Sequence, residues 1–222
     1  MSEALDELLT YLALEQVDDT IFLGQTPSET RQRVFGGLVA SQALLSAGKT
    51  VDESRPVHSL HGYFLVGGHP GQTITYVVEK VRDGGSFTTR RVVAQQHGIP
   101  IFVMTSSFQK RETGFVHTTP MPSGMANPED LPTWQERLAP IMGSIDAETA
   151  KWLVNDRPID TRSQTTPAWV DPTPRPAEQD VWFKADGQLP DDPLLHACII
   201  AYASDLTLLD TAMLPHGVDV SR

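Results

Sequence analysis

Residues 34–48 have the sequence VFGGLVASQALLSAG, an apolar segment that begins after two glycines and ends on a third. The Ala- and Ser-rich interior predicts a helix over 38–47, and Gly48 is typical of a helix terminus. Small side chains on a helix permit a close approach of neighbouring backbone. We therefore expect this helix to lie deep against a β-sheet, with a short strand over 21–24 before it.

The residues that follow this helix predict β-structure. Runs of β-branched and alternating residues, separated by short glycine-bearing connections, cover 57–66, 73–81, 86–96 and 99–109. His97-Gly98 predicts a hairpin turn between the last two strands. Short connections favour antiparallel neighbours, so we expect a meander. A strand, a buried helix and a curved antiparallel sheet in this order describe a hot-dog fold, of the α+β class.

The composition changes after the fourth of these strands. Prolines recur between residues 112 and 178, and only short stretches near Trp134 and Trp152 have a helical pattern. One further strand is predicted at 159–162. We interpret this region as a long linker that carries minor helices.

The order of strand and then helix recurs near the C-terminus, with a strand at 181–185 and an apolar helix over 194–209. The first helix is followed by a full set of strands, whereas only a short tail follows the second. We therefore expect a double hot-dog whose second half is incomplete. The expected divisions are an N-terminal hot-dog at 1–111, a Pro-rich linker at 112–178, and the start of a C-terminal hot-dog at 179–222.

Asp205 lies inside the second predicted helix. At about 100° per residue from Leu194, it projects at roughly 20°, between Ala201 and Leu208 on the apolar face. An ionised carboxylate in such a place is costly unless it is paired. The pattern leaves two interpretations open. The carboxylate is bonded to nearby backbone or directed to water, or it faces a pocket that uses it.

The composition argues against several classes of function. The net charge is −11 and no basic run offsets it, which argues against nucleic-acid binding but not against a small polyanionic ligand. The single cysteine, Cys198, offers no disulfide framework and favours a reducing compartment. From the first and last residues given, we expect neither a signal peptide, nor a membrane anchor, nor a peroxisomal address. We expect a cytoplasmic protein without a membrane span.

Several motifs follow one another in order along essentially the whole chain: 33–37, 42–44, 57–65, 81–87, 90–92, 100–102, 107–109, 156–158, 201–206 and 214–217. Through them the chain closely resembles the type II acyl-CoA thioesterases, double hot-dog enzymes that hydrolyse fatty acyl-CoA. The resemblance implies that Asp205 is the catalytic aspartate. It also implies a cooperating hydroxyl residue and a glutamine on the sheet after the Asp205 helix, and no residue of this chain can be given those roles.

Thioester hydrolysis needs a positioned water, a base that takes its proton, and donors for the developing oxyanion. Asp205 in a partly apolar cleft suits the base, because desolvation raises the basicity of a carboxylate. Direct attack by Asp205, which would form an acyl anhydride, is the less favoured route. The backbone N–H groups of Gly36 and Gly37 are candidates for the oxyanion hole, unless these glycines serve close packing alone.

Further candidates are a histidine and three arginines. His58 and His61 are three apart on a strand, so we expect them on opposite faces and no metal site between them. His58 is a weak catalytic candidate or a hydrogen-bonded core histidine. Arg82, Arg90 and Arg91 are candidates for the phosphates of coenzyme A. One of the adjacent pair is expected to face solvent or an interface.

Rival chemistries lack their motifs, since we find no nucleophile elbow, zinc-protease helix, P-loop or dinucleotide-binding loop. A dyad of Cys198 and His196 is excluded because the two project about 160° apart on a helix. We expect a hydrolase of fatty acid and lipid metabolism that takes acyl-CoA, needs no metal or cofactor, and forms a homo-oligomer. The alternatives are a non-catalytic acyl-CoA-binding or interaction module, and a chain whose missing sheet comes from a longer parent or a companion.

Overall fold

The computed structural model describes residues 2–28, 33–143, 145, 150, 154–168 and 170–217. The chain forms two compact units, and each is assembled from separate stretches of sequence. The sheet unit comprises Glu7–Phe115 and Leu189–Asp205. The hairpin unit comprises Met1–Asp6, Val116–Gln188 and Leu206–Arg222. Helix α1 (Glu3–Tyr11) begins in the hairpin unit and ends in the sheet unit.

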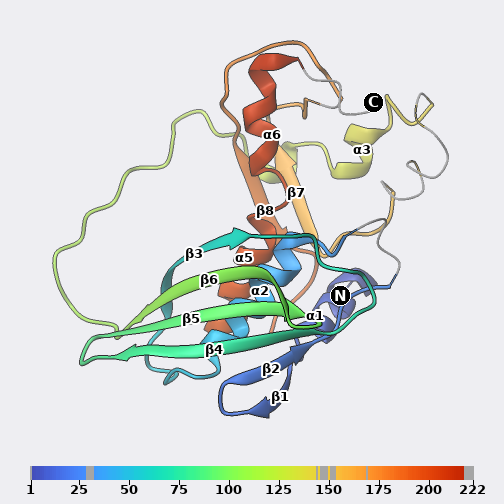
Figure 1. Cartoon of the computed structure of the whole chain (residues 1–222). Helices are drawn as coiled ribbons and strands as arrows, with labels where there is room; N and C mark the ends of the chain where they lie inside the picture. The colour runs from blue at the N-terminus through green and yellow to red at the C-terminus, as the bar shows by residue number, and fades with distance from the viewer. Residues whose placement is uncertain are drawn as a thin grey trace. The chain divides into compact units, whose positions relative to one another are not determined.

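The sheet unit contains one antiparallel sheet, in the order β1-β2-β4-β5-β6-β3 (Figure 1). Its strands are β1 (Glu15–Asp18), β2 (Ile21–Gly24), β3 (Val57–Phe64), β4 (Ile74–Asp83), β5 (Phe87–Gln96) and β6 (Ile99–Gln109). His97 and Gly98 both have positive φ, 50° and 77°, as a tight two-residue hairpin turn requires. The predicted strands and this turn are confirmed.

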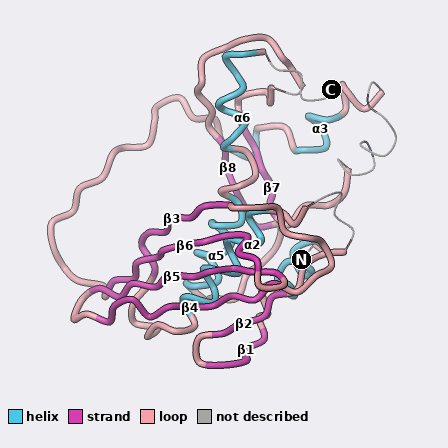
Figure 2. Tube along the Cα trace, viewed as in Figure 1, coloured by secondary structure: helices cyan, strands magenta, loops and turns pink. Residues whose placement is uncertain are grey.

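Helix α2 (Gly36–Gly48) packs against one face of this sheet, as predicted, and α5 (Pro193–Ala203) packs beside it (Figure 2). All residues of α2 except Gly36 and Ala40 are buried. Small side chains permit this burial, because a Cβ added at Gly48 would collide with Leu194 of α5. The helix therefore has a neighbour on nearly every side.

The one amide side chain of α2 is completely buried and fully bonded. Gln42 Nε2 donates to the carbonyl oxygens of Tyr11 at 2.7 Å and Gln25 at 3.0 Å. Its Oε1 accepts from the hydroxyl of Tyr76 on β4 at 2.6 Å. A Cβ at Gly24 would lie 2.5 Å from the same Oε1. Gln42 thus fixes α2 against β2, β4 and the end of α1.

The predicted meander is wrong for β3. This strand pairs with β6 at the edge of the sheet, whereas β4 pairs with β2 and β5. Beyond the end of β3, the N–H of Leu65 still donates to the Ile101 carbonyl at 2.9 Å, which keeps the chain beside β6. The connection from Leu65 to Thr73 is long enough to pass β6 and β5 and reach the position of β4. The length of a connection, and not only its glycine content, decides whether the two strands that it joins can be neighbours in the sheet.

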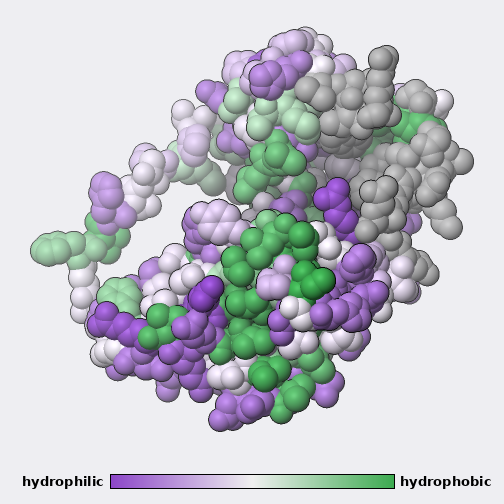
Figure 3. Space-filling view, viewed as in Figure 1, coloured by the Kyte–Doolittle hydropathy of each residue, from purple (hydrophilic) through white to green (hydrophobic). Residues whose placement is uncertain are grey.

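The sheet face opposite α2 carries a hydrophobic row. The register aligns Ile21, Val77, Val93 and Val103 on four neighbouring strands, and these residues alternate with the buried ones that face the helix. Figure 3 shows a hydrophobic band that crosses the strands on this face. We refer to these four residues as the outer row.

The second predicted helix is not continuous. Helix α5 ends at Ala203 and α6 (Leu208–Met213) begins after a turn, so Asp205 lies in the turn and not on an apolar helix face. Ser204 Oγ donates to the Ala201 carbonyl at 2.7 Å, and the N–H of Asp205 reaches Tyr202 instead of Ala201. Such short-range bonds tighten and end a helix.

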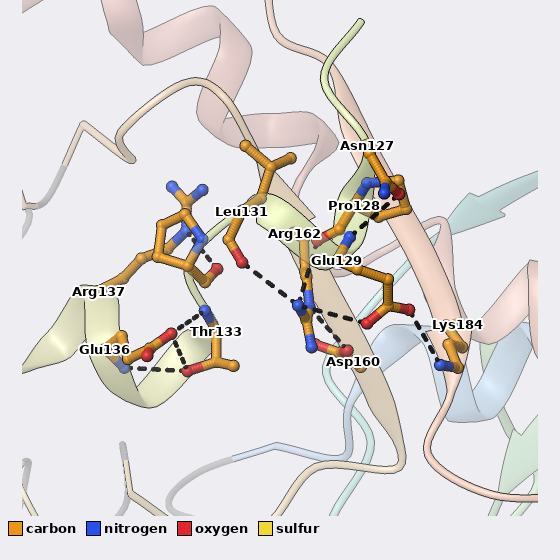
Figure 4. A network of polar contacts seen from close by, with 11 residues as sticks. Asn127, Pro128, Glu129, Leu131, Thr133, Glu136, Arg137, Asp160, Arg162 and Lys184 are labelled. Atoms are coloured by element: carbon orange, nitrogen blue, oxygen red, sulfur yellow. Dashed lines mark hydrogen bonds and ion pairs between the residues drawn. The ribbon is translucent and has the colours of Figure 1, made fainter.

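The hairpin unit is built around β7 (Ile159–Ser163) and β8 (Val181–Ala185), which pair antiparallel. Its other elements are η1 (Pro128–Asp130), α3 (Trp134–Leu138), α6 and η2 (Leu214–His216). Arg162 of β7 bonds Asp160 at 3.0 Å and the carbonyls of Pro128 and Leu131, which ties η1 to the strand (Figure 4). The helix near Trp134 and the strand at 159–162 are confirmed, whereas Trp152 lies outside the described residues.

The two units divide the chain differently from the expected regions. The stretch Leu189–Asp205, assigned to the start of a second hot-dog, belongs with the N-terminal sheet. The reason is the packing of α5 on α2, which a division by linear sequence does not anticipate.

Candidate active site

The start of α2 is open toward the end of α5. Phe35, at the N-cap, has no oxygen with which to cap the helix. Its ring instead packs edge-to-face on Tyr202 of α5, with 4.9 Å between centroids. A Cβ at Gly37 would collide with the backbone oxygen of Tyr202. Glycine at this position therefore lets the two helices approach.

Asp205 lies opposite this helix start. The backbone N–H of Gly37 is hydrogen-bonded to its carboxylate. A Cβ at Gly36 would lie 2.5 Å from Asp205 Oδ2 and 2.8 Å from the ring of Phe64. Gly37 thus donates to the carboxylate, and Gly36 leaves room for it.

The electrostatic environment of Asp205 suits a base. Burial raises the pKa of its carboxyl above the usual value, and the Gly37 N–H opposes that rise. The positive end of the helix dipole at this N-terminus also favours the ionised carboxylate, and so acts on the pKa in the same direction as the Gly37 N–H. Asp205 nevertheless remains accessible to solvent, so its carboxylate can meet a water molecule.

A cavity of about 410 Å³ opens beside Asp205. Among the residues that the structure describes, Asp205 and Arg33 are the charged ones that line it. The glycines Gly36, Gly67 and Gly68 also line it. The rest of the lining is apolar and consists of Val34, Val39, Phe64, Leu65, Val66 and Ile101. A mainly apolar cavity with few polar groups is typical of a small-molecule site.

The two oxyanion-hole candidates have different positions. The Gly37 N–H faces the Asp205 carboxylate and lowers its pKa. Its role as an oxyanion donor stays a prediction. Gly36 lines the cavity and keeps the proposed role.

His58 does not line the cavity. Its Nε2 lies 2.8 Å from Ser107 Oγ and its ring packs on Phe87. The register skips one residue of β3 between Val57 and Ser59, and this bulge turns His58 to the face that also holds Ser107. His61 is paired with Thr105 on that same face. The expectation of opposite faces is therefore wrong, because the bulge breaks the alternation. It also removes His58 from the neighbourhood of Asp205.

Arg90 is buried and fully bonded. Its Nε donates to Thr50 Oγ1 at 2.8 Å, and one Nη donates to Asp83 Oδ1 at 2.7 Å. The remaining N–H groups donate to the backbone oxygens of Thr50, Arg82 and Thr89. No donor is left for a phosphate. This contradicts the expected role of Arg90, which is structural.

Arg82 and Arg91 are exposed but lie apart from the cavity. Arg91 forms an ion pair of 3.4 Å with Glu79. Arg82 is paired in register with Thr89, two residues before Arg91, so both arginines are on the face opposite α2. Arg33, by contrast, lines the same cavity as Asp205. It stands three residues before Gly36, in the stretch 33–37 that carries part of the family resemblance. Helix periodicity assigns no role to Arg33, because this residue precedes the helix.

The side chains of Cys198 and His196 have structural surroundings. Burial raises the pKa of the Cys198 thiol strongly, and His196 Nε2 lies 2.9 Å from the Pro190 carbonyl. Within the described ranges, no group of three His, Cys, Asp or Glu side chains has the arrangement of a metal site.

Pro193–His216 has the length and composition of a membrane-crossing helix. That is weak evidence, because core helices pass the same test and α5 contains buried residues.

The chain is similar to known proteins along most of its length. Residues 26–109 match the family described as acyl-CoA thioesterase N-terminal domain, and residues 154–222 match the family described as acyl-CoA thioesterase. The chain is 37% identical over 216 residues to acyl-CoA thioesterase 2 of Haemophilus influenzae. That alignment covers 97% of this chain and 75% of the relative.

Two solved structures are similar along nearly the whole chain. Acyl-CoA thioesterase II from Mycobacterium marinum has a TM-score of 0.71 at 40% identity, covering 95% of this chain and 71% of that chain. A protein with a hot dog fold from Alicyclobacillus acidocaldarius has a TM-score of 0.70 at 18% identity, covering 100% of this chain and 74% of that chain. The second likeness concerns the fold alone. The hot-dog class is thereby confirmed, and the incompleteness of the second hot-dog stays a prediction.

Proposed function

Because this chain belongs to the type II acyl-CoA thioesterase family, we infer that it hydrolyses acyl-CoA thioesters to a carboxylic acid and coenzyme A. The observation that carries the proposal is Asp205, a carboxylate of raised pKa held by a helix N-terminus at the edge of a mainly apolar cavity. The cavity suits an acyl chain, and the carboxylate suits the activation of water.

The reaction follows from this geometry. Asp205 takes a proton from a water molecule as the water oxygen attacks the thioester carbonyl carbon, and negative charge develops on the carbonyl oxygen. We assign the stabilisation of that charge to the Gly36 N–H, because it lies at the positive end of α2. The tetrahedral intermediate then collapses, the C–S bond breaks, and the thiolate leaves with the bonding electron pair. The proton held by Asp205 passes to the thiolate or to solvent.

We propose three further properties. The protein works in the cytoplasm, in fatty acid and lipid metabolism, and assembles as a homo-oligomer. An acidic chain with one buried cysteine supports the first, and the half-buried hydrophobic outer row supports the last. Cell fractionation tests the location, and sedimentation equilibrium tests the assembly. A monomer at micromolar concentration would contradict the oligomer.

Replacement of Asp205 by asparagine tests the function directly. The variant keeps the shape and one acceptor for the Gly37 N–H but cannot take a proton, so we expect kcat for acyl-CoA hydrolysis to fall by about 10²- to 10⁴-fold. Asp210→Asn is the matched control, because burial also raises the pKa of Asp210 but that residue does not line the cavity. Near-normal turnover by Asp205→Asn would overturn the assignment, as would inactivity of the unchanged protein toward every acyl-CoA chain length.

A further inference from the structure

Arg33 differs from other arginines of the sheet unit in having donors to spare at the cavity. The guanidinium groups of Arg55 and Arg90 are bonded to backbone and side-chain oxygens. Arg33 lines the cavity beside Asp205 and is exposed. Within the part of the chain that the structure describes, no hydrogen bond or ion pair occupies its guanidinium. Its donors are therefore available to a ligand.

The chain holds Arg33 at this place. The N–H of the next residue, Val34, donates to the Gly68 carbonyl at 3.0 Å. The aliphatic stem of Arg33 lies on Gly67, where an added Cβ would come within 2.7 Å of Arg33 Cδ. The glycine pair thus fixes the backbone of Arg33 and gives its side chain a surface on which to rest.

The charges of the cavity discriminate between ligands. Asp205 disfavours an anionic group at its own end, and the apolar walls disfavour one along their length. A guanidinium binds phosphate or carboxylate through paired, charge-assisted hydrogen bonds. In a chain with a net charge of −11, a local cation at the cavity is needed to receive such a group.

We propose that Arg33 determines specificity by binding an anionic group of the thioester substrate, either a phosphate of coenzyme A or a carboxylate at the far end of the acyl chain. The proposal rests on the proposed function for the kind of substrate. The reactive carbonyl lies at Asp205, and the anionic group lies at Arg33. The part of the substrate that joins them, the pantetheine arm or the acyl chain, fills the space between.

The test measures equilibrium binding of thioethers, which cannot be hydrolysed. The probes are S-decyl-coenzyme A, S-decyl-N-acetylcysteamine, which has no charge, and the same N-acetylcysteamine thioether with a carboxylate at the end of its decyl chain. Calorimetry compares the unchanged protein with Arg33→Gln and Arg33→Lys. Arg111→Gln is the matched control, because Arg111 is exposed and does not line the cavity. Thermal unfolding of each variant verifies that it is folded.

We expect Arg33→Gln to weaken binding of one anionic probe by roughly ten- to a hundredfold. We expect the neutral probe to bind as before, Arg33→Lys to retain part of the affinity, and Arg111→Gln to change nothing. Loss on the coenzyme A probe identifies a phosphate as the ligand, and loss on the carboxylate probe identifies the acyl terminus. Equal loss on the neutral probe, no loss on any probe, or no binding of any probe by the unchanged protein would overturn the proposal.

Hydrolysis of decanoyl-coenzyme A, followed in parallel, separates this proposal from the proposed function. If the protein binds an anionic probe through Arg33 but releases no thiol from decanoyl-coenzyme A, the anion site stands and the proposed thioesterase function is wrong. A protein that hydrolyses the thioester, but whose binding of both anionic probes is unchanged by Arg33→Gln, retains the function and loses the anion site.

Discussion

At the scale of single residues, two adjacent glycines serve one carboxylate in different ways. Gly37 donates its N–H to Asp205, and the space for a side chain at this position is closed by the Tyr202 backbone. Gly36 is open to the cavity, and the space for its side chain is taken by Asp205 Oδ2. Substitution of either glycine therefore affects the same carboxylate by a different route.

Gly36→Ala separates catalysis from folding. The new Cβ would push the carboxylate and the Phe64 ring aside, so we expect kcat to fall by about 10²-fold, as displacement of a reacting group by an ångström does. We expect the free energy of unfolding to fall by about 1–3 kcal/mol from overpacking. Steady-state kinetics and urea unfolding measure the two effects. Unchanged kcat would show that Asp205 does not need its present position.

Asp205→Asn is expected to gain or keep stability while it loses activity. The raised pKa means that the folded state binds the proton more tightly than the unfolded state does. Stability from this group therefore falls as pH rises from the ordinary value of 3.8 through the raised folded value, and at pH 7 the ionised carboxylate costs stability. Asparagine removes that cost. Urea unfolding at pH 7 should find the variant at least as stable, and below pH 3.8 the advantage should disappear.

The candidate carboxylate, Asp205, could be predicted from the sequence, but its setting could not. Asp205 was expected inside a continuous helix, on the apolar face. The structure ends the helix at Ala203 because the Ser204 hydroxyl and the Asp205 N–H form short-range bonds. A period of 3.6 residues continues through such a break, so the pattern could not reveal it. Arg33 was missed for a related reason, because its role depends on a cavity formed by distant residues.

At the scale of elements, α2 is positioned by one buried amide. Gln42 satisfies three polar groups of separate segments: the carbonyls of Tyr11 and Gln25 and the hydroxyl of Tyr76. Burial also raises the pKa of the Tyr76 hydroxyl, so that group remains a donor throughout the physiological range.

Gln42→Leu should therefore destabilise the protein well beyond the loss of one contact. Three buried polar groups would lose their partner, and we expect the free energy of unfolding to fall by about 3 kcal/mol or more. Tyr76→Phe removes one of these bonds and keeps the ring, so about 1 kcal/mol is expected. Urea unfolding of both variants tests the order. A larger effect from Tyr76→Phe would contradict it.

Strand positions could be predicted from alternation, whereas their order in the sheet could not. The alternation of apolar and polar residues shows which side of a strand is buried. It is the same for β3 and β4 whichever strand each has as its neighbour, so it does not reveal the order. The bulge at His58 is likewise hidden, since one inserted residue on an exposed edge strand leaves composition unchanged. Arg90 illustrates the same limit, because an arginine on a strand has the same pattern whether it binds phosphate or Asp83 and Thr50.

At the scale of the whole molecule, charge opposes the arrival of the proposed substrate. The net charge is −11, and coenzyme A is itself a polyanion. Arg33 acts only at contact distance, whereas the summed negative charge acts on the approaching ligand from further away. The local and the global fields thus have opposite signs at this site.

Salt should therefore accelerate capture of acyl-CoA. Raising ionic strength from about 0.01 M to 0.15 M shortens the Debye length from about 30 Å to about 8 Å, which screens the long-range repulsion more than a contact. We expect kcat/KM for decanoyl-coenzyme A to rise severalfold over this range and kcat/KM for the uncharged decanoyl-N-acetylcysteamine to stay constant. A fall with salt for the charged substrate alone would mean that local cations such as Arg33, and not the net charge, govern its approach.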